Sequence, residues 1–131
     1  MTTRRLERLP SHPSRRLERL PSRRLSGGAT VHEATTAAAR LLGLAFLRAI
    51  PPGHALLIPQ CRSVHTFGMR FPLDIVFLDE RGAVLRVERG VRPGRVLFCR
   101  RAFAVLETRA GEAARFSPPI RPAARAGASG P

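Results

Sequence analysis

The sequence predicts an α+β domain that is mostly β, with one N-terminal helix packed on a small, curled, barrel-like sheet. Two observations support this fold class. Apolar residues recur at the period of a helix within residues 33–48. From residue 55 onward they fall in short alternating runs separated by glycine and proline. One helix followed by several short strands is typical of an α+β fold.

The chain length allows one folded domain. Its 131 residues are enough to bury a core without disulfide bonds or metal ions. Composition divides the chain into an arginine-rich tail (residues 1–29), a globular unit (residues 30–116) and a tail rich in proline, alanine and glycine (residues 117–131). We expect the first tail to be disordered and the second to be loose, because both contain few apolar residues.

The predicted helix at residues 33–48 has a start signal and a stop signal. Thr30 is a candidate cap, with Glu33 as its capping-box partner. The segment Pro51-Pro52-Gly53 ends the helix. Gly43 inside it indicates close packing against a sheet or an earlier helix end near Arg40. The predicted buried face consists of Ala34, Ala37, Ala38, Leu41, Leu42, Ala45 and Phe46.

Short strands are predicted after the helix. Two of them form a β-hairpin, because the turn residues Glu80-Arg81-Gly82 separate two alternating runs. Pro93-Gly94 and Gly111 separate the later runs. The predicted strands are residues 55–59, 72–79, 83–91, 95–102 and 104–111.

The N-terminal tail is repetitive. The string RRLERLPS occurs at residues 4–11 and again at residues 15–22. Pro10, Pro13 and Pro21 interrupt the copies before two helical turns can form. Two interpretations stay open. One is a basic arm that binds nucleic acid or lipid headgroups, and the other, which we favour, is a dispensable extension.

The net charge of +14 comes from arginine alone, since the 23 basic residues include no lysine. Clustered arginines bind phosphates, so one interpretation is a surface for nucleic acid or an anionic membrane. The other is a solvated surface whose arginines reflect a GC-rich coding sequence. We favour the second, because alanine, glycine, proline and leucine are abundant as well.

Cysteine content and hydropathy bear on location. Two cysteines, Cys61 and Cys99, do not make a disulfide scaffold. No apolar run approaches the roughly 20 residues of a membrane span. The paired arginines near the start are not followed by the apolar stretch of a signal peptide. We therefore expect a cytoplasmic protein with free thiols and no membrane span.

The clearest motif begins at Cys61 and reads VHTFGMRFPLDIVFLD from Val64 onward. Four flanking elements accompany it in order: R-x-x-G-L at residues 40–44, G-x-V-L at residues 82–85, Pro93, and V-L-E-x-x-A-G at residues 105–111. In this combination the chain resembles the prokaryotic family known as domain of unknown function 192, over about residues 31–116.

The resemblance implies a small, mostly β fold with a barrel-like sheet and a short helix. No biochemical activity is established for that family. The sequence departs from the family pattern at residues 112–131, where members usually continue with a glycine-rich turn and a last strand that contains acidic residues. We expect the closing strand to be short or missing here.

Cys61, His65 and Met69 recur at intervals of four residues. A thiolate, an imidazole and a thioether from one loop are the ligand types of a blue-copper site. Such a site needs a second histidine from another strand, and the sequence offers none at a suitable place. A structural zinc site fails for the same reason, because Cys99 supplies only a third ligand. We expect no metal and no cofactor.

Cys61, His65 and Asp74 include the residue types of a nucleophile, a base and an acid. Triads are assembled in space, so this spacing neither supports nor excludes one. The architectural interpretation needs no ligand: a strand whose core-facing residues alternate over residues 67–77. Asp74 would then accept hydrogen bonds from Thr66, the His65 ring or neighbouring backbone N–H groups, because a buried carboxylate needs partners.

We therefore favour a non-catalytic accessory or binding domain over an enzyme, with a small ligand or a protein as its partner. Nucleic-acid binding is weakly supported, because single-strand readers need exposed aromatic rings and most phenylalanines fall at core-facing positions. The alternative is a Cys/His-dependent enzyme or a soft-metal protein that uses Cys61, His65 and Asp74. The oligomeric state stays open. The candidate ligand-binding residues are Cys61, His65, Thr66, Met69, Arg70 and Asp74.

Overall fold

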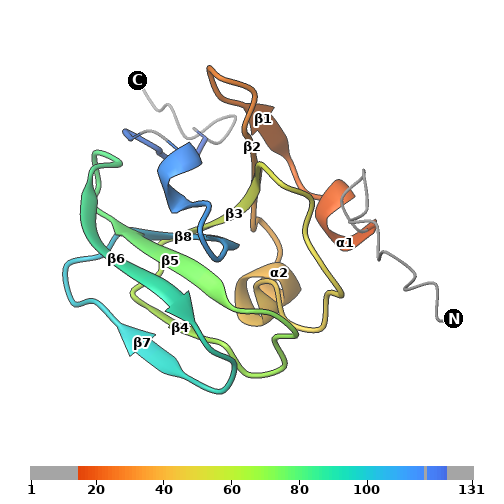
Figure 1. Ribbon diagram of the computed structural model, residues 1–131. Coiled ribbons are helices and arrows are strands. Elements are labelled where there is room, and N and C mark those ends of the chain that lie inside the picture. The colour runs from red at the N-terminus through yellow and green to blue at the C-terminus, as the bar shows by residue number, and fades with distance from the viewer. Residues whose placement is uncertain (1–14, 117, 124–131) are drawn as a thin grey trace, which may run out of the picture.

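A six-stranded sheet is the centre of the fold. The computed structural model describes residues 15–116 and 118–123 (Figure 1). The strand order is β1-β2-β3-β8-β5-β6, and β4 and β7 form a separate antiparallel ribbon. Neighbouring strands of the sheet are antiparallel except β2 and β3, which are parallel. The strands are β1 (Ser22–Arg24), β2 (Thr30–Glu33), β3 (His54–Pro59), β4 (Ser63–His65), β5 (Leu73–Leu78), β6 (Val84–Val91), β7 (Val96–Phe98) and β8 (Ala104–Arg109).

Three short helices accompany the strands: α1 (Arg15–Glu18), α2 (Ala37–Leu42) and the 3-10 helix η1 (Ala113–Arg115). α2 lies on the connection between the parallel strands β2 and β3. None of the helices in the described ranges has the length and the hydropathy needed to cross a membrane.

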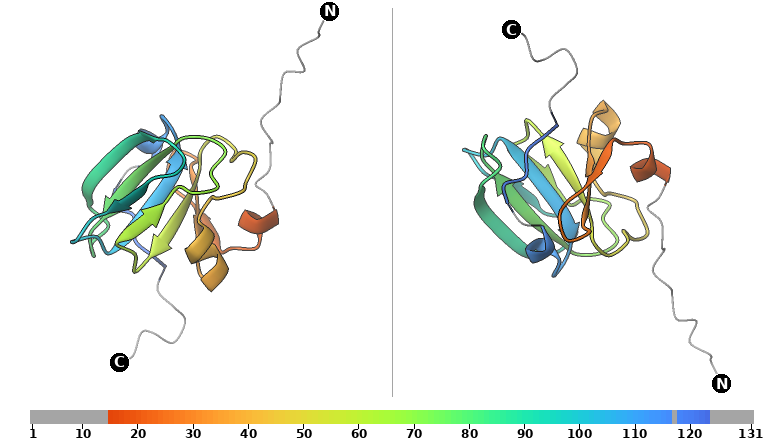
Figure 2. Two further views of the ribbon diagram at one scale, coloured as in Figure 1. Left: turned by 90° about the horizontal axis from the view of Figure 1, so that it is seen from below. Right: turned by 90° about the horizontal axis from the view of Figure 1, so that it is seen from above.

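Side chains pack against both faces of the sheet. All of β5 is buried. Leu73, Ile75 and Phe77 of this strand enter a first core, and Val76 and Leu78 enter a second. α1, α2 and the β4–β7 ribbon contribute to the first core, whereas η1 and the C-terminal segment contribute to the second (Figure 2). The sheet is therefore the middle of three layers.

The predicted mostly β, α+β class is confirmed, but the predicted barrel is wrong. β1 and β6 are the two edges of the sheet and do not pair with each other. β4 and β7 pair only with each other, because their inward side chains, Val64 and Leu97, cover the first core instead of extending the sheet. The sheet is curled and open.

The predicted helix is too long and begins at the wrong residue. Thr36, not Thr30, caps α2, because the Thr36 hydroxyl accepts a hydrogen bond from the Ala39 N–H at 3.0 Å. β2 occupies the predicted start, since its pairing with β3 buries Val31. The helix ends at Gly43, whose φ of +56° leaves the helical region.

The predicted hairpin is confirmed. β5 and β6 pair in antiparallel fashion. The carboxylate of Asp79 accepts hydrogen bonds from the N–H groups of Arg81 (2.8 Å) and Ala83 (3.0 Å) and so fixes the turn. β3, β7 and β8 fall at the other runs that alternation predicts.

Residues 15–29 differ from the disordered tail that composition predicts. They contain α1 and β1, and β1 pairs with β2. Leu17 and Leu20 are buried in the first core. These two leucines supply enough apolar surface to hold a short basic segment against the domain. The rest of the predicted tail, residues 1–14, lies outside the described residues.

Part of the predicted C-terminal tail also packs on the domain. Ile120 is buried in the second core, and its N–H donates to the Gly82 carbonyl at 3.0 Å. A Cβ at position 82 would lie 2.6 Å from the Ile120 backbone, so this close approach requires glycine. Residues 117 and 124–131 lie outside the described residues.

Candidate functional site

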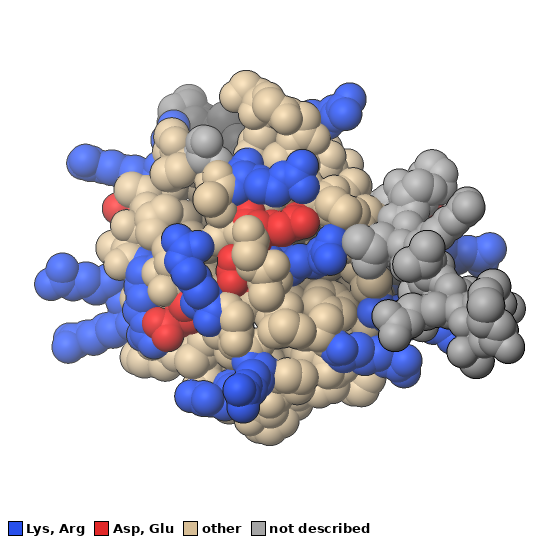
Figure 3. Space-filling model, in the orientation of Figure 1, with Lys and Arg blue, Asp and Glu red and all other residues tan. Residues whose placement is uncertain are grey.

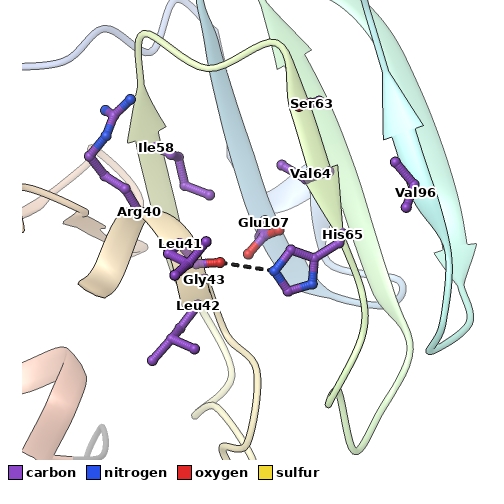
Figure 4. Close-up of a pocket in the computed structure, with 10 residues that line it drawn as sticks. All are labelled: Arg40, Leu41, Leu42, Gly43, Ile58, Ser63, Val64, His65, Val96 and Glu107. Carbon is purple, nitrogen blue, oxygen red and sulfur yellow. Dashed lines mark hydrogen bonds between the residues drawn. The ribbon is translucent and has the colours of Figure 1, made fainter. Parts of the chain in front are cut away.

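A pocket of about 310 Å³ opens beside the end of α2. Figure 4 shows Leu41, Leu42 and Gly43 on one side of it, His65 on β4 opposite them, and Glu107 on β8 between the two walls. The remaining lining residues are Arg40, Ile58, Ser63, Val64 and Val96. The pocket therefore lies between the sheet, the helix end and the β4–β7 ribbon.

Glu107 is the most unusual group in this pocket. β8 alternates between the two cores, and Glu107 lies on the same face as Val105, toward the first core. The residue is 2% exposed, and its Oε1 atom has no hydrogen-bond partner among the described residues. A buried carboxyl group with an unmet oxygen costs free energy, so it requires a physical reason.

Burial raises the pKa of Glu107 from its ordinary 4.5 to about 7. A hydrogen bond from the Leu44 backbone and the nearby charge of Arg16 oppose this rise without cancelling it. Near neutral pH the carboxyl group is therefore about half protonated.

Gly43 makes room for this carboxyl group. A Cβ at position 43 would lie 2.7 Å from Glu107 Oε1, which is closer than van der Waals contact allows. The Gly43 carbonyl in turn accepts a hydrogen bond of 2.6 Å from the Arg16 guanidinium. The R-x-x-G-L element of the sequence thus forms the pocket wall that faces Glu107.

The carbonyl of Leu41 fixes the protonation of the His65 ring. Nε2 of His65 lies 2.9 Å from that carbonyl oxygen, which can only accept, so Nε2 carries the proton. In that tautomer Nδ1 is an acceptor, and within the described ranges it is buried without a partner. When Glu107 is ionised, the pocket residues Glu107 and His65 therefore hold two acceptor atoms without hydrogen-bond partners in the described structure.

Large apolar side chains surround the pocket. Leu41 is 70% exposed and Val96 is 64% exposed, although both line it. Phe67 stacks on the His65 ring at 5.8 Å, and Phe98 lies opposite Ser63 in the ribbon. A concentration of exposed apolar side chains on one surface marks an interaction site more often than a chance arrangement.

This rim corrects the predicted buried face of the helix. Leu41 and Phe46 do not belong to a buried helix face, because the helix ends before Phe46 and Leu41 points outward; Phe46 is 62% exposed. Phe46, Phe67 and Phe98 are each more than half exposed. The other four phenylalanines, Phe71, Phe77, Phe103 and Phe116, lie in or against the two cores, so the prediction that most phenylalanines face the core is confirmed.

Thr66 and Met69, two predicted site residues, have structural contacts. The Thr66 hydroxyl donates to the Arg92 carbonyl (2.7 Å) and accepts from the Arg95 N–H (2.8 Å), and the residue is fully buried. Met69 is buried in the first core. These residues hold the loop before β5 against the loop before β7.

Asp74 is also structural, but its partners differ from those predicted. Its carboxylate accepts hydrogen bonds from the backbone N–H groups of Gly90 (2.9 Å), Gly111 (2.9 Å) and Ala113 (3.1 Å). Neither Thr66 nor the His65 ring is among them. Asp74 therefore joins β6 and the turn after β8 to β5, instead of holding the loop at residues 62–71.

Cys61, His65 and Asp74 do not form a hydrogen-bonded triad in the described structure. The Cys61 thiol donates to the Ser63 carbonyl at 3.0 Å, and each of the other two residues contacts the backbone groups named above. Burial raises the pKa of the Cys61 thiol, which disfavours the reactive thiolate. Arg70 is exposed.

Across the part of the chain that the structure describes, no group of three or more His, Cys, Asp or Glu residues is placed to hold a metal ion. His32 and His54, the two other histidines in the described residues, pair with each other and not with His65. Nε2 of His32 and Nδ1 of His54 lie 2.8 Å apart on the adjacent strands β2 and β3.

The sequence analysis missed Glu107, which the structure places at the pocket wall. A signal for it existed. Ala104, Val105 and Leu106 are apolar on both faces of their strand, so a carboxylate that continues the strand must enter one of the two cores. The predicted site residues all came from the reactive residue types of the loop, so Glu107 was not among them.

The family model of domain of unknown function 192, described as an uncharacterized family, matches residues 22–118. A search of curated proteins gives no match. Two solved structures are similar. One, from Sinorhizobium meliloti 1021, is described as a candidate transcription regulator; it is 25% identical with a TM-score of 0.59, over 72% of this chain and 81% of that chain.

The other is a protein of unknown function from Novosphingobium aromaticivorans DSM 12444. It is 23% identical with a TM-score of 0.58, over 72% of this chain and 74% of that chain. The second likeness shows a shared fold, and the family model covers most of the folded unit that carries the pocket. The chain belongs to the domain of unknown function 192 family.

Proposed function

We propose that this protein is a non-catalytic binding domain whose pocket takes a small apolar molecule that carries a hydrogen-bond donor. The observation that carries the proposal is the unmet Oε1 atom of Glu107, which is 2% exposed at the wall of a pocket of about 310 Å³. Ligand pockets typically combine an apolar lining with a few oriented polar groups. A ligand donor would supply the hydrogen bond that Glu107 lacks.

The donor character of the ligand follows from what the pocket offers. Once Glu107 is ionised, its Oε1 atom and His65 Nδ1 are acceptors without partners in the described residues. The two arginines beside the pocket are already engaged. Arg16 donates to the Gly43 carbonyl, and Arg40 donates to the carbonyls of Pro59 and Gln60. A ligand that presents only acceptors would therefore leave Glu107 unsatisfied.

Binding fits this site better than catalysis. A hydrolytic mechanism needs a nucleophile in contact with a base. The Cys61 thiol donates to a backbone carbonyl, and its raised pKa keeps it protonated. His65 donates from Nε2 to the Leu41 carbonyl, which orients the ring but does not place it against a nucleophile. The candidate list from the sequence is thereby reduced to His65, with Glu107 and Gly43 added.

The test is a fragment titration followed in ¹H–¹⁵N spectra at pH 8, where a carboxyl group with a pKa of about 7 is mostly ionised. The probes are butylamine, butanol and butyramide, which carry donors, and butyrate, which carries only acceptors at this pH. We expect the donor fragments to shift the amides of Gly43, His65 and Glu107, and butyrate to leave them unchanged. Glu107→Leu should weaken donor binding at least about tenfold, the value of one hydrogen bond to a charged group.

Glu88→Leu is the matched control, because Glu88 is a partly exposed carboxylate on β6 that pairs with Arg86 at 3.0 Å. It should leave fragment binding unchanged. Shifts that are equal for butyrate and butylamine, or that survive in Glu107→Leu, would refute the proposed site.

An oligothymidylate titration distinguishes nucleic-acid binding from the proposed binding of a small ligand. The charge of +14 and three exposed phenylalanines favour that alternative more than the sequence alone did. The visible basic side chains, however, are scattered with acidic groups between them and form no single stripe (Figure 3). We expect weak, salt-sensitive binding that does not compete with the fragments. Tight binding that displaces them would overturn the small-ligand proposal.

A further inference from the structure

Residues 15–22 dock on the domain through contacts that depend on their sequence. Leu17 is 1% exposed and Leu20 is 8% exposed, and both lie in the first core beside residues of the α2 region. The surface that holds this segment is called the repeat seat below. It consists of the adjoining part of the first core, the Gly43 carbonyl and the backbone N–H of Glu33.

Polar contacts fix the segment in one register. The Arg16 guanidinium donates to the Gly43 carbonyl at 2.6 Å, and the Pro21 carbonyl accepts from the Glu33 N–H at 2.8 Å. The repeat seat therefore recognises an Arg-Leu-x-x-Leu-Pro pattern, with the arginine at the Gly43 carbonyl and the leucines in the first core.

The chain contains this pattern twice. Residues 4–11 and 15–22 are identical, RRLERLPS. Each anchor of the docked copy has the same residue eleven positions earlier, namely Arg5, Leu6, Leu9 and Pro10. A seat that recognises the docked copy by these side chains has no means of rejecting the other one through them.

We propose that the repeat seat accepts either copy, so that residues 4–11 of the same chain take it when residues 15–22 leave. Residues 4–11 can then occupy the repeat seat in place of residues 15–22. Arg5 takes the place of Arg16 at the Gly43 carbonyl, so the exchange preserves the pocket wall.

Flanking residues decide which copy is preferred. The second copy continues into β1, whose Arg24 lies opposite Thr30 of β2. In the same register the first copy would place Pro13 there, which has no N–H to donate. Its docking also leaves eleven more residues to loop out before β2, at an entropic cost that grows slowly with length. The second copy is therefore the favoured occupant.

The test compares one pair of substitutions in two chains. Leu17→Ala with Leu20→Ala is made in the full chain and in a chain that lacks residues 4–14, and urea unfolding is followed for each. In the shortened chain the pair should raise the unfolding constant at least about a thousandfold, since each buried Leu→Ala change is costly. In the full chain we expect a rise of roughly thirtyfold or less, because the first copy replaces the second.

Leu6→Ala with Leu9→Ala is the control. Alone in the full chain it should have no effect, and combined with the Leu17 and Leu20 changes it should restore the thousandfold loss. If the doubly substituted short chain does not fold while the full chain does, the proposal is supported. Equal losses in the two chains would overturn it. Rescue that grows with protein concentration and produces dimers would also overturn it, since the copy would then come from another molecule.

Discussion

Replacing Asp74 by alanine is expected to remove a large part of the stability of the protein. The Asp74 carboxylate is fully buried and is the acceptor for three backbone N–H groups, those of Gly90, Gly111 and Ala113. Removing it leaves these donors buried without partners, and we expect a loss of about 3–5 kcal/mol. That loss is a large share of the roughly 5–15 kcal/mol that stabilises a typical folded domain. Urea unfolding and the dispersion of the ¹H–¹⁵N spectrum measure it.

Asp79→Ala is the matched control. Asp79 also accepts two backbone hydrogen bonds, from Arg81 and Ala83, but in a solvent-exposed turn where water can replace the carboxylate. We expect it to cost only about 1 kcal/mol. If the two substitutions cost the same, the buried network around Asp74 is not what joins β6 and the turn after β8 to β5.

Gly43→Ala is expected to destabilise the protein by about 2–4 kcal/mol and to abolish fragment binding. Two causes act together. The backbone at Gly43, with φ of +56° and ψ of −128°, is strained for any residue with a Cβ. The new methyl group would also lie 2.7 Å from Glu107 Oε1 and would enter the pocket. Urea unfolding measures the loss of stability, and the butylamine titration measures the loss of fragment binding.

Gly111→Ala separates the two causes. Gly111 has a φ of +87°, and a Cβ there would meet no atom within 4 Å, so the substitution reports backbone strain alone. We expect it to cost less than Gly43→Ala and to leave fragment binding intact. In the double variant Gly43→Ala with Glu107→Ala, the shorter side chain at position 107 removes the steric overlap. This variant should therefore recover part of the difference in stability between Gly43→Ala and Gly111→Ala. Equal costs at the two glycines would mean that Gly43 does not contact Glu107.

The parts of the fold that local patterns determine were predicted well. Alternation and turn residues located the β5–β6 hairpin, because both signals lie within about twenty neighbouring residues. The barrel and the long helix were wrong because they depend on distant partners. Thr30 resembles a helix cap in the sequence, but pairing with β3 makes it the first residue of a strand. The tandem copies at residues 4–22 read as a tail, although the seat for Leu17 is built from residues far along the chain.

Only part of the site was predicted, because its other residues also depend on partners that are distant in the sequence. His65 lies at the pocket, as the motif indicated. Thr66, Met69 and Asp74 share the motif but satisfy structural needs that only the folded chain reveals. Glu107 was overlooked because a single carboxylate in a strand carries no spacing signal. Its importance comes from burial and from the missing partner of Oε1 in the described structure.

The raised pKa of Glu107 has a consequence for stability. The folded protein keeps this proton up to about pH 7, whereas the unfolded chain loses it near 4.5. The stabilisation is therefore fully present below about pH 4.5 and is lost as the pH rises through 7, by roughly 3 kcal/mol. His32 acts in the opposite direction, because burial and the neighbouring His54 lower its pKa to about 4. Comparison with Glu107→Gln isolates the contribution of Glu107.

We conclude that Glu107 is a buried carboxyl group at the pocket wall whose Oε1 atom has no hydrogen-bond partner among the described residues. A ¹³C-detected pH titration of its side-chain carboxyl carbon tests this most directly. We predict a midpoint near 7 in the free protein, and a shift of that midpoint when butylamine is added. A midpoint at the ordinary 4.5 that butylamine does not move would contradict the claim, because it would mean that the group is solvated or already paired.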